Sequence, residues 1–298
     1  MINGFVNVYK EQGYTSFDVV AKLRGILKQK KIGHTGTLDP LAEGVLLVCL
    51  GNATKMCDLL TEKNKSYTCV MLLGKTTDTE DITGKVLTEN NNIPDEETVK
   101  SAIMSFVGDY QQLPPMYSAI KVNGKKLYEL ARQGIEVQRE KRPVTIHRIE
   151  IEKTTLPRVT FRVSCSKGTY IRSLCRDIGE QLGCGAVMEQ LVRTEVKGFA
   201  IKDSLKLSEL ERARDEGNLM EHIIPTDMLM KDLPALHVNE TSMKLLLNGN
   251  KLAPSDFEEN EIIDGKNVRV YDAEGEFKAL YAYDNDKGQY VPFKMFLS

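Results

Sequence analysis

Long apolar runs are absent from this sequence, and their absence limits what the protein can be. No stretch approaches the roughly 20 apolar residues that a membrane-spanning helix needs, so we expect no membrane insertion. The opening MINGFVNVYK contains neither a basic n-region nor a long apolar segment, so no secretory signal is expected. CxxC pairs are also missing, which argues against a disulfide framework or a zinc cluster built on the six cysteines (Cys49, Cys57, Cys69, Cys165, Cys175 and Cys184). A reduced, cytoplasmic protein is expected.

Familiar metal and phosphate motifs are missing as well. No HxxxH or other metal-ligand spacing occurs, so no protein-bound metal is expected on the four histidines (His34, His147, His222 and His237). The GKT at residues 74–76 lacks the first glycine of a phosphate-binding loop, because that position holds Cys69. Asp39 and Glu43 could be imagined as a glycosidase pair, but the proline and glycine that follow them make a shared helix face unfavourable.

The composition itself is that of an ordinary globular protein, with 41% hydrophobic and 28% charged residues. A length of 298 residues favours one large domain with an appendage, or two domains. The net charge is only −2, but residues 21–31 carry five basic and no acidic residues, whereas residues 255–298 carry ten acidic against five basic. A charge run is often just a solvated face. Here the basic run precedes an unusual motif, as a phosphate-binding surface would require.

That motif is GHTGTLDP, residues 33–40, and the apolar spacing around it predicts its setting. A helix is predicted over residues 17–31, with Ser16 as a plausible N-cap and a basic exposed face. The run GVLLVCLG at residues 44–51 predicts a buried strand. The motif is therefore expected to be a loop between a helix and a strand.

Further along the chain, residues 66–73 and 159–165 are predicted strands, and the second leads through GTYIR into a predicted helix over residues 171–182. Residues 111–142 are polar and rich in lysine and arginine, which predicts a surface excursion with one short helix. Short strands with turn signals after about residue 233 predict a small, separate β domain.

The lone carboxylate of the motif, Asp39, is the candidate for chemistry. An aspartate before a proline is common in turns, because the pre-proline position favours extended geometry. Three features favour a site instead. Pro40 stiffens the loop, while Gly33 and Gly36 let the backbone come close to a ligand. His34 and the threonines add hydrogen-bonding groups, and polar loops of this kind often carry site residues.

Arg172 stands near the start of its predicted helix, where a cation opposes the helix dipole. It is either a surface arginine, at a cost of some tenths of a kcal/mol, or a residue that reaches a carboxylate or a phosphate with its planar fork. Tyr67 and Tyr170 are either ordinary half-buried aromatics or stacking surfaces for a base.

Taken together, these segments resemble the TruB family of bacterial tRNA pseudouridine-55 synthases. The resemblance extends over about two thirds of the chain in the family's order. The family usually has Lys-Pro where this chain has Lys10 and Glu11, a difference that concerns the local backbone rather than the chemistry. The segments that carry the resemblance are KEQGYTSFDVV (10–20), KIGHTGTLDPLAEGVLLVCLGNATK (31–55), KSYTCVMLLGKTTDTED (65–81), PPMYSAIKVNGKKLYELAR (114–132), SCSKGTYIRSLCRDIG (164–179) and LVRTEVKGF (191–199).

The resemblance implies a cofactor-free isomerisation of uridine at position 55 in the T loop of tRNA, in which the N1 glycosidic bond breaks, the base turns and C5 bonds to C1′. Asp39 matches the essential aspartate of the family. Its oxygen either attacks the nucleotide covalently or removes a ribose proton on the way to a glycal, and both routes stay open. By the same match, Tyr67 packs against the flipped base and assists loss of the C5 proton. Arg172 would pair with Asp39 and keep it ionised when the site closes.

Other residues of the site are implied in the same way. His34 would fill the space that the flipped base leaves, Leu191 would line the pocket, and Tyr170 and Lys10 complete the substrate-binding set. A stacked uridine must leave its stack to react, at a cost of a few kcal/mol. Phosphate contacts would offset that cost, and for these the basic run offers three lysines (Lys28, Lys30 and Lys31).

The expected fold is α/β (α+β). Residues 1–232 would form a catalytic domain on a mixed, largely antiparallel sheet with a central cleft, with 111–142 contacting RNA, and residues 233–298 would form a PUA-like RNA-binding domain. The expected partner is the T stem-loop of tRNA, with no obligatory protein partner. Two alternatives stay open: an RNA-binding or RNA-folding module without turnover, and the related guide-RNA-dependent synthase subunit.

Overall fold

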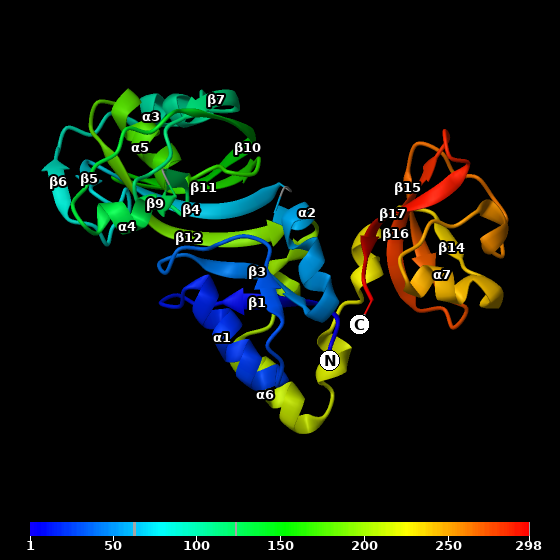
Figure 1. The fold of residues 1–298 in the computed structure, drawn as a ribbon. Helices are drawn as coiled ribbons and strands as arrows, with labels where there is room; N and C mark the ends of the chain where they lie inside the picture. The colour runs from blue at the N-terminus through cyan, green and yellow to red at the C-terminus, as the bar shows by residue number, and fades with distance from the viewer. Residues whose placement is uncertain (62–63, 123, 298) are drawn as a thin grey trace.

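A large mixed sheet forms the centre of the computed structural model, which describes residues 1–61, 64–122 and 124–297 (Figure 1). Its strands run in the order β1-β3-β12-β4-β11-β10-β7, with β2 and β13 paired to β3 and β12. Within the described residues, neighbouring strands of this sheet pair antiparallel except β12 with β3, so the expected mixed, largely antiparallel sheet is confirmed. The strands are β1 (Gly4–Lys10), β2 (Ile32–His34), β3 (Glu43–Leu50), β4 (Lys65–Leu73), β7 (Gly108–Gln112), β10 (Arg142–Thr155), β11 (Arg158–Cys165), β12 (Ala186–Val196) and β13 (Phe199–Ala200).

Helices bury their apolar stripes against two parts of this sheet (Figure 1). Helices α3 (Glu96–Met104) and α5 (Ile171–Gln181) pack in a core with β4, β11 and β12. Helices α1 (Ser16–Leu27) and α6 (Leu207–Glu216) pack in a second core with β1 and β3. Two cores on one sheet leave the junction of β3, β12 and β4 between them, and the candidate site lies there.

Helix α1 differs from its prediction at both ends. Its N-cap is Thr15, which forms a capping box with Asp18, whereas Ser16 is buried and used elsewhere. The helix ends at Leu27 rather than at residue 31, because Lys28 adopts a left-handed conformation (φ 52°) as the C-cap. The chain then turns into β2, which pairs with β3. The basic run is therefore split between the helix and the turn after it.

The segment between β7 and β10 leaves the sheet as predicted and contains the short helix α4 (Leu127–Ala131), after the two-residue strands β8 (Lys121–Val122) and β9 (Lys125–Lys126). A hairpin of β5 (Lys75–Thr77) and β6 (Val86–Glu89) extends from the end of β4. Helix α2 (Cys57–Thr61) follows a 3-10 turn over Gly51–Met56.

A second, four-stranded sheet forms a C-terminal β-rich domain with its own core (Figure 1). A separate apolar cluster, which includes Phe5, Met56, Leu280 and Phe296, joins this domain to the 3-10 turn and the edge of the large sheet. No helix within the described ranges is long and apolar enough to cross a membrane. The strands of the small sheet are β14 (Ala235–His237), β15 (Asn267–Tyr271), β16 (Phe277–Asp284) and β17 (Gln289–Met295), beside α7 (Met243–Leu247).

Candidate active site

An ion pair between Asp39 and Arg172 forms the centre of the candidate site. The Nε atom of Arg172 lies 2.9 Å from Oδ2 of Asp39. The arginine side chain is 4% exposed, while the carboxylate is 37% exposed. The carboxylate therefore faces solvent with one side and a buried cation with the other, so an incoming molecule could reach it.

The loop that carries Asp39 is fastened on both sides of the carboxylate. The Ser16 hydroxyl accepts a hydrogen bond from Leu38 N (2.8 Å) and donates one to Leu38 O (3.2 Å). Gly13 N donates to Pro40 O at 2.8 Å. These contacts explain why Ser16 is buried rather than capping α1, and they hold the residues on either side of Asp39 before any substrate arrives.

Lys10 lies beneath the same loop. It has no exposed surface, and its Nζ donates to Ala42 O at 2.5 Å and to Glu11 O at 3.3 Å. Burial lowers the pKa of Lys10 to about 8, against the opposing effect of the Asp39 charge. Glu11, where the family usually has proline, pairs with Lys206 at 3.4 Å. Lys10 thus contacts the loop backbone from within the protein.

Arg172 is held in place by two carbonyls in addition to Asp39. Its Nη1 donates to Thr79 O at 2.9 Å and its Nη2 to Tyr117 O at 2.8 Å. Thr79 lies in the β5–β6 turn and Tyr117 at the start of the excursion. All three nitrogens of the guanidinium group therefore have a partner, which fixes its orientation toward the carboxylate.

Two more arginines hold the start of the excursion. Arg176 donates to Leu113 O at 2.9 Å, and Arg139 donates to Pro114 O at 2.8 Å. With the Arg172 contact to Tyr117 O, three guanidinium groups bind carbonyls within residues 113–117. The excursion is thereby joined to α5 directly beside the ion pair.

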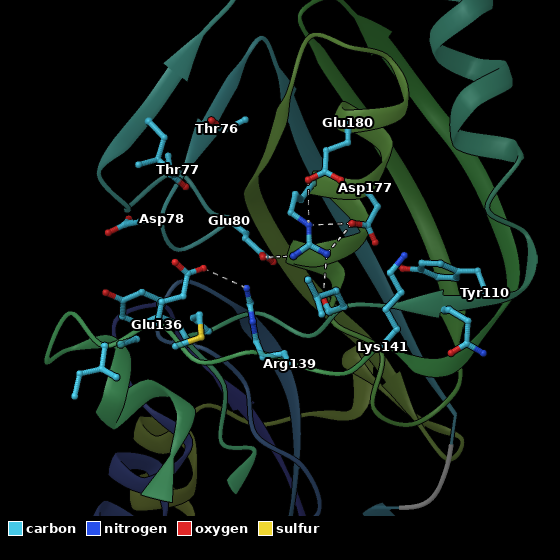
Figure 2. Close-up of a pocket in the computed structure, with 18 of the residues that line it drawn as sticks. Thr76, Thr77, Asp78, Glu80, Tyr110, Glu136, Arg139, Lys141, Asp177 and Glu180 are labelled. Atoms are coloured by element: carbon cyan, nitrogen blue, oxygen red, sulfur yellow. Dashed lines mark hydrogen bonds and ion pairs between the residues drawn. The ribbon is translucent and has the colours of Figure 1, made fainter. Parts of the chain in front are cut away.

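Helix α5 is tied to the β5–β6 turn by Glu80. This buried carboxylate accepts hydrogen bonds from the Ser173 hydroxyl (2.6 Å) and from Arg176. The guanidinium of Arg176 lies among the carboxylates of Glu80, Asp177 and Glu180 (Figure 2). Because Ser173 follows Arg172 directly, this network fixes the first turn of α5 against the carbonyl of Thr79.

A pocket of about 840 Å³ opens between β5, α5 and the excursion (Figure 2). Tyr110, Glu136, Arg139 and Lys141 line it, together with the acidic residues around Arg176. Its lining includes neither Asp39 nor Arg172. The pocket is thus next to the ion pair and separate from it.

Tyr67 and Leu191 come from neighbouring strands on the floor of the site. In the β4–β12 pairing, Cys69 lies opposite Leu191 and Tyr67 lies opposite Arg193. Tyr67 and Leu191 are both 7% exposed and share an apolar cluster with Leu38 of the loop. Burial raises the pKa of the Tyr67 hydroxyl to about 12, with Arg193 acting in the opposite direction.

Arg193 is a residue that the sequence did not single out. It is 1% exposed, and its guanidinium donates to Val45 O (2.7 Å), Gly36 O (3.1 Å) and Thr37 O (3.4 Å). Burial lowers its pKa, and a hydrogen bond with the Tyr67 hydroxyl opposes that effect. The only hint in the sequence is its place two residues after Leu191, on the same face of the strand.

His34 lies at the end of β2, before the Asp39 loop, and Tyr170 lies directly before α5, which carries Arg172. The Nδ1 atom of His34 accepts a hydrogen bond from Gly36 N at 3.3 Å, and burial, then the charge of Arg193, lowers the pKa of its ring. Tyr170 precedes α5, and its backbone is held by both ends of the Gln112 amide. Burial raises the pKa of the Tyr170 hydroxyl, and the charges of Arg172 and Asp39 also act on it.

Lys28, Lys30 and Lys31 are exposed in the turn between α1 and β2. They precede the Asp39 loop in the chain and are separated from it by β2. Among the described residues, no group of three or more His, Cys, Asp or Glu side chains could hold a metal ion.

Comparisons with known proteins agree on a family. The model for the TruB family pseudouridylate synthase (N terminal domain) matches residues 24–171, and that for the tRNA pseudouridylate synthase B C-terminal domain matches residues 172–231. A protein of Lachnoclostridium phytofermentans named tRNA pseudouridine synthase B is 53% identical over 307 residues, which cover 99% of this chain and 100% of that protein. Its namesake in Clostridium acetobutylicum is 48% identical, with 94% and 95% covered.

Solved structures share the fold at lower identity. A Cbf5-Nop10-Gar1 complex contains a chain with a TM-score of 0.71 and 27% identity, covering 99% of this chain and 85% of that one. An H/ACA RNP bound to a substrate RNA containing 2′-deoxyuridine contains another, with a TM-score of 0.71, 25% identity and the same coverage. The fold and the sequence matches define the class as the pseudouridylate synthases, which are isomerases. Within that class, this chain belongs to the TruB family.

Proposed function

We propose that this chain isomerises uridine to pseudouridine at position 55, in the T loop of tRNA, without a cofactor. The observation that carries the proposal is the pair of Asp39 and Arg172, a half-exposed carboxylate held by a buried guanidinium. The names of the relatives, tRNA pseudouridine synthase B, support tRNA as the substrate. The reaction would take place in the cytoplasm, with no obligatory protein partner.

Asp39 is the essential group in this proposal, and its oxygen acts at the sugar of the target nucleotide. The oxygen either attacks the nucleotide covalently or removes a ribose proton on the way to a glycal. Arg172 orients the carboxylate, because its other two donor positions are occupied by the carbonyls of Thr79 and Tyr117. A preorganised charge pair of this kind acts at the reacting centre without having to rearrange during the reaction.

Base flipping brings the uracil to this carboxylate. Tyr67 packs against the flipped base and assists loss of its C5 proton, and Leu191 lines the pocket beside it. His34 fills the space that the base vacates, and Tyr170 contacts the substrate from the start of α5. Lys10 contributes from beneath, through the backbone of the Asp39 loop.

RNA contacts outside the pocket offset the cost of unstacking, which is a few kcal/mol. We assign phosphate contacts to Lys28, Lys30 and Lys31 and RNA contacts to the excursion 111–142. Residues 1–232 would be the catalytic domain, and residues 233–298 a PUA-like RNA-binding domain.

The test compares the wild-type protein with Asp39→Asn, which keeps the shape of the side chain and removes its charge. Release of the uracil C5 hydrogen from unmodified tRNA should fall below detection, while tRNA binding stays within a few-fold of the wild type. The matched control is Asp58→Asn, an exposed aspartate in α2. Substantial product from pure Asp39→Asn protein would refute the proposal. Binding without hydrogen release by the wild type would favour an RNA-folding module instead.

A further inference from the structure

Arg193 carries a buried charge for which the described residues provide no carboxylate partner. Its hydrogen-bond partners among these residues are three neutral carbonyls and the Tyr67 hydroxyl. A charge taken out of water without a counter-charge costs several kcal/mol, and arginine, unlike lysine, cannot shed its proton to avoid the cost. Because its burial is unfavourable, a cation at the floor of the site indicates a role beyond packing.

The backbone places this guanidinium between two essential parts of the site. Arg193 lies directly opposite Tyr67 across β4 and opposite Gly44 across β3. Gly44 has φ 101°, and a Cβ at that position would collide with the carbonyl of Arg193, so only glycine allows this close approach. From there the side chain reaches Gly36 O and Thr37 O, in the loop that ends in Asp39.

We propose that Arg193 is a positioning residue of this site, whose single guanidinium holds both the Tyr67 hydroxyl and the loop that carries Asp39. The inference rests on the proposed function, because it assumes that Tyr67 assists removal of the C5 proton. In that step the C5–H bond breaks, its electron pair forms the C5–C6 double bond, and the electrons displaced onto N1 take a proton from water. The Tyr67 oxygen takes up the C5 proton while it passes its own hydroxyl proton to water, so it carries partial negative charge during the step.

The positive charge of Arg193 stabilises negative charge on the Tyr67 oxygen. An opposite charge within hydrogen-bonding distance favours the ionised form of a titratable group. Here it opposes the effect of burial, which raises the pKa of Tyr67 to about 12. Lys10 and Lys65 also lie near Arg193, but burial lowers the pKa of each to about 8, so above that pH arginine is the cation of the three that keeps its full charge.

The experiment measures single-turnover pseudouridine formation by the full chain on unmodified tRNA whose target uridine carries hydrogen or deuterium at C5. Arg193→Lys keeps a charge but loses the fork. We expect its rate constant to fall about 100-fold, as for a small misplacement of reacting groups. We also expect a larger hydrogen-to-deuterium rate ratio than in the wild type, because the C5 step becomes slower. A double variant with Tyr67→Phe should be slower than Tyr67→Phe by less than the factor that Arg193→Lys alone produces, because the part of the loss that acts through Tyr67 is already present.

Arg269→Lys is the matched control, because Arg269 makes the same kind of contacts in the C-terminal sheet. It donates to the Tyr271 hydroxyl at 2.8 Å and to Leu233 O at 3.0 Å. Its substitution should leave the isotope ratio at the wild-type value. Two results would indicate a purely structural role and overturn the inference. One is an isotope ratio in Arg193→Lys equal to that of the wild type. The other is a rate loss in the double variant equal to the product of the losses in Arg193→Lys and Tyr67→Phe.

Failure of the inference differs from failure of the proposed function. If Tyr67→Phe itself leaves the rate and the isotope ratio unchanged, the role of Tyr67 is wrong and the inference falls with it. If Tyr67→Phe is impaired and Arg193→Lys is normal, the inference alone is overturned. If circular dichroism shows that Arg193→Lys does not fold, the contact is tested instead by comparing the guanidinium NMR signals of Arg193 in the wild type and in Tyr67→Phe. They should differ, and identical signals would exclude the contact.

Discussion

Lys10 and Arg193 are buried cations near Asp39 whose charges are held by backbone carbonyls rather than by acids. Lys10 is the clearest example, because it is fully buried and its Nζ donates to Ala42 O. Burial lowers its pKa from 10.5 to about 8. The burial that brings Lys10 against the loop therefore also makes the stability of the folded state depend on pH.

The stability of the protein should rise with pH above about 8 because of Lys10. Between pH 8 and 10.5 the unfolded chain keeps the lysine proton that the folded chain has lost, so unfolding becomes less favourable as pH increases. From about pH 7.5 to about pH 9.5 the contribution is roughly 2 kcal/mol. Urea unfolding of wild type and Lys10→Met at the two pH values measures it. The variant should lack this part of the increase, Lys100→Met at an exposed position should keep it, and equal pH dependence in all three would contradict the account.

At the scale of elements, the first turn of α5 depends on the hairpin packed against it. Glu80 has a positive φ of 63° and binds both Ser173 and Arg176, so the β5–β6 turn is shaped to meet this helix. Its neighbour Thr79 gives its carbonyl to Arg172. The orientation of the active-site arginine is therefore set by an element that lies outside the loop with Asp39.

Glu80→Ala should lower the free energy of unfolding by about 2–3 kcal/mol, because it leaves the buried Ser173 hydroxyl and part of Arg176 without a partner. Turnover should fall as well, through the loosened Thr79 carbonyl. Denaturant unfolding and single-turnover assays measure the two effects. Glu89→Ala, at a 64% exposed position paired with Lys75, is the control and should change stability by no more than about 0.5 kcal/mol. Equal effects of the two substitutions would argue against the network.

The turn between α1 and β2 should bind RNA phosphates. If it does, tRNA affinity falls steeply with salt, and charge reversal of Lys28 or Lys30 flattens the slope of log affinity against log salt by roughly one unit per lost contact. Filter binding over a series of salt concentrations measures the slope. Lys100→Glu, on α3 and paired with Glu96, should leave it unchanged. An unaltered slope in Lys28→Glu and Lys30→Glu would place the phosphates elsewhere.

For the whole molecule, local patterns predicted three strands of the large sheet (β3, β4 and β11), helices α1 and α5 and the β-rich C-terminal domain, and they marked Asp39 and Arg172 as candidate site residues. Arg172 was recognisable because its charge opposes the dipole of its helix, and Asp39 because it is the lone carboxylate of a polar loop stiffened by proline. Arg193 was not, because its burial depends on β12 pairing with β3, and it meets Val45, 148 residues away in the sequence. Contacts between strands so distant in sequence leave no periodic signal. The end of α1 was misplaced for a smaller reason, the left-handed turn at Lys28.

The two domains are packed against each other as well as connected. Lys55 of the 3-10 turn donates to Met295 O at 2.8 Å, beside the apolar cluster that contains Phe5 and Phe296. The same turn follows β3, the strand that begins after the Asp39 loop. RNA held by the small domain would therefore be held at a defined position relative to the site.

The central claim is that this chain, alone, converts one uridine of tRNA at the Asp39 and Arg172 pair. Mapping pseudouridine by sequencing in unmodified tRNA treated with the pure protein, without guide RNA or cofactor, tests it most directly. The account predicts modification at position 55 by the wild type and none by Asp39→Asn. Modification at another position, a need for guide RNA, or equal modification by the variant would contradict it.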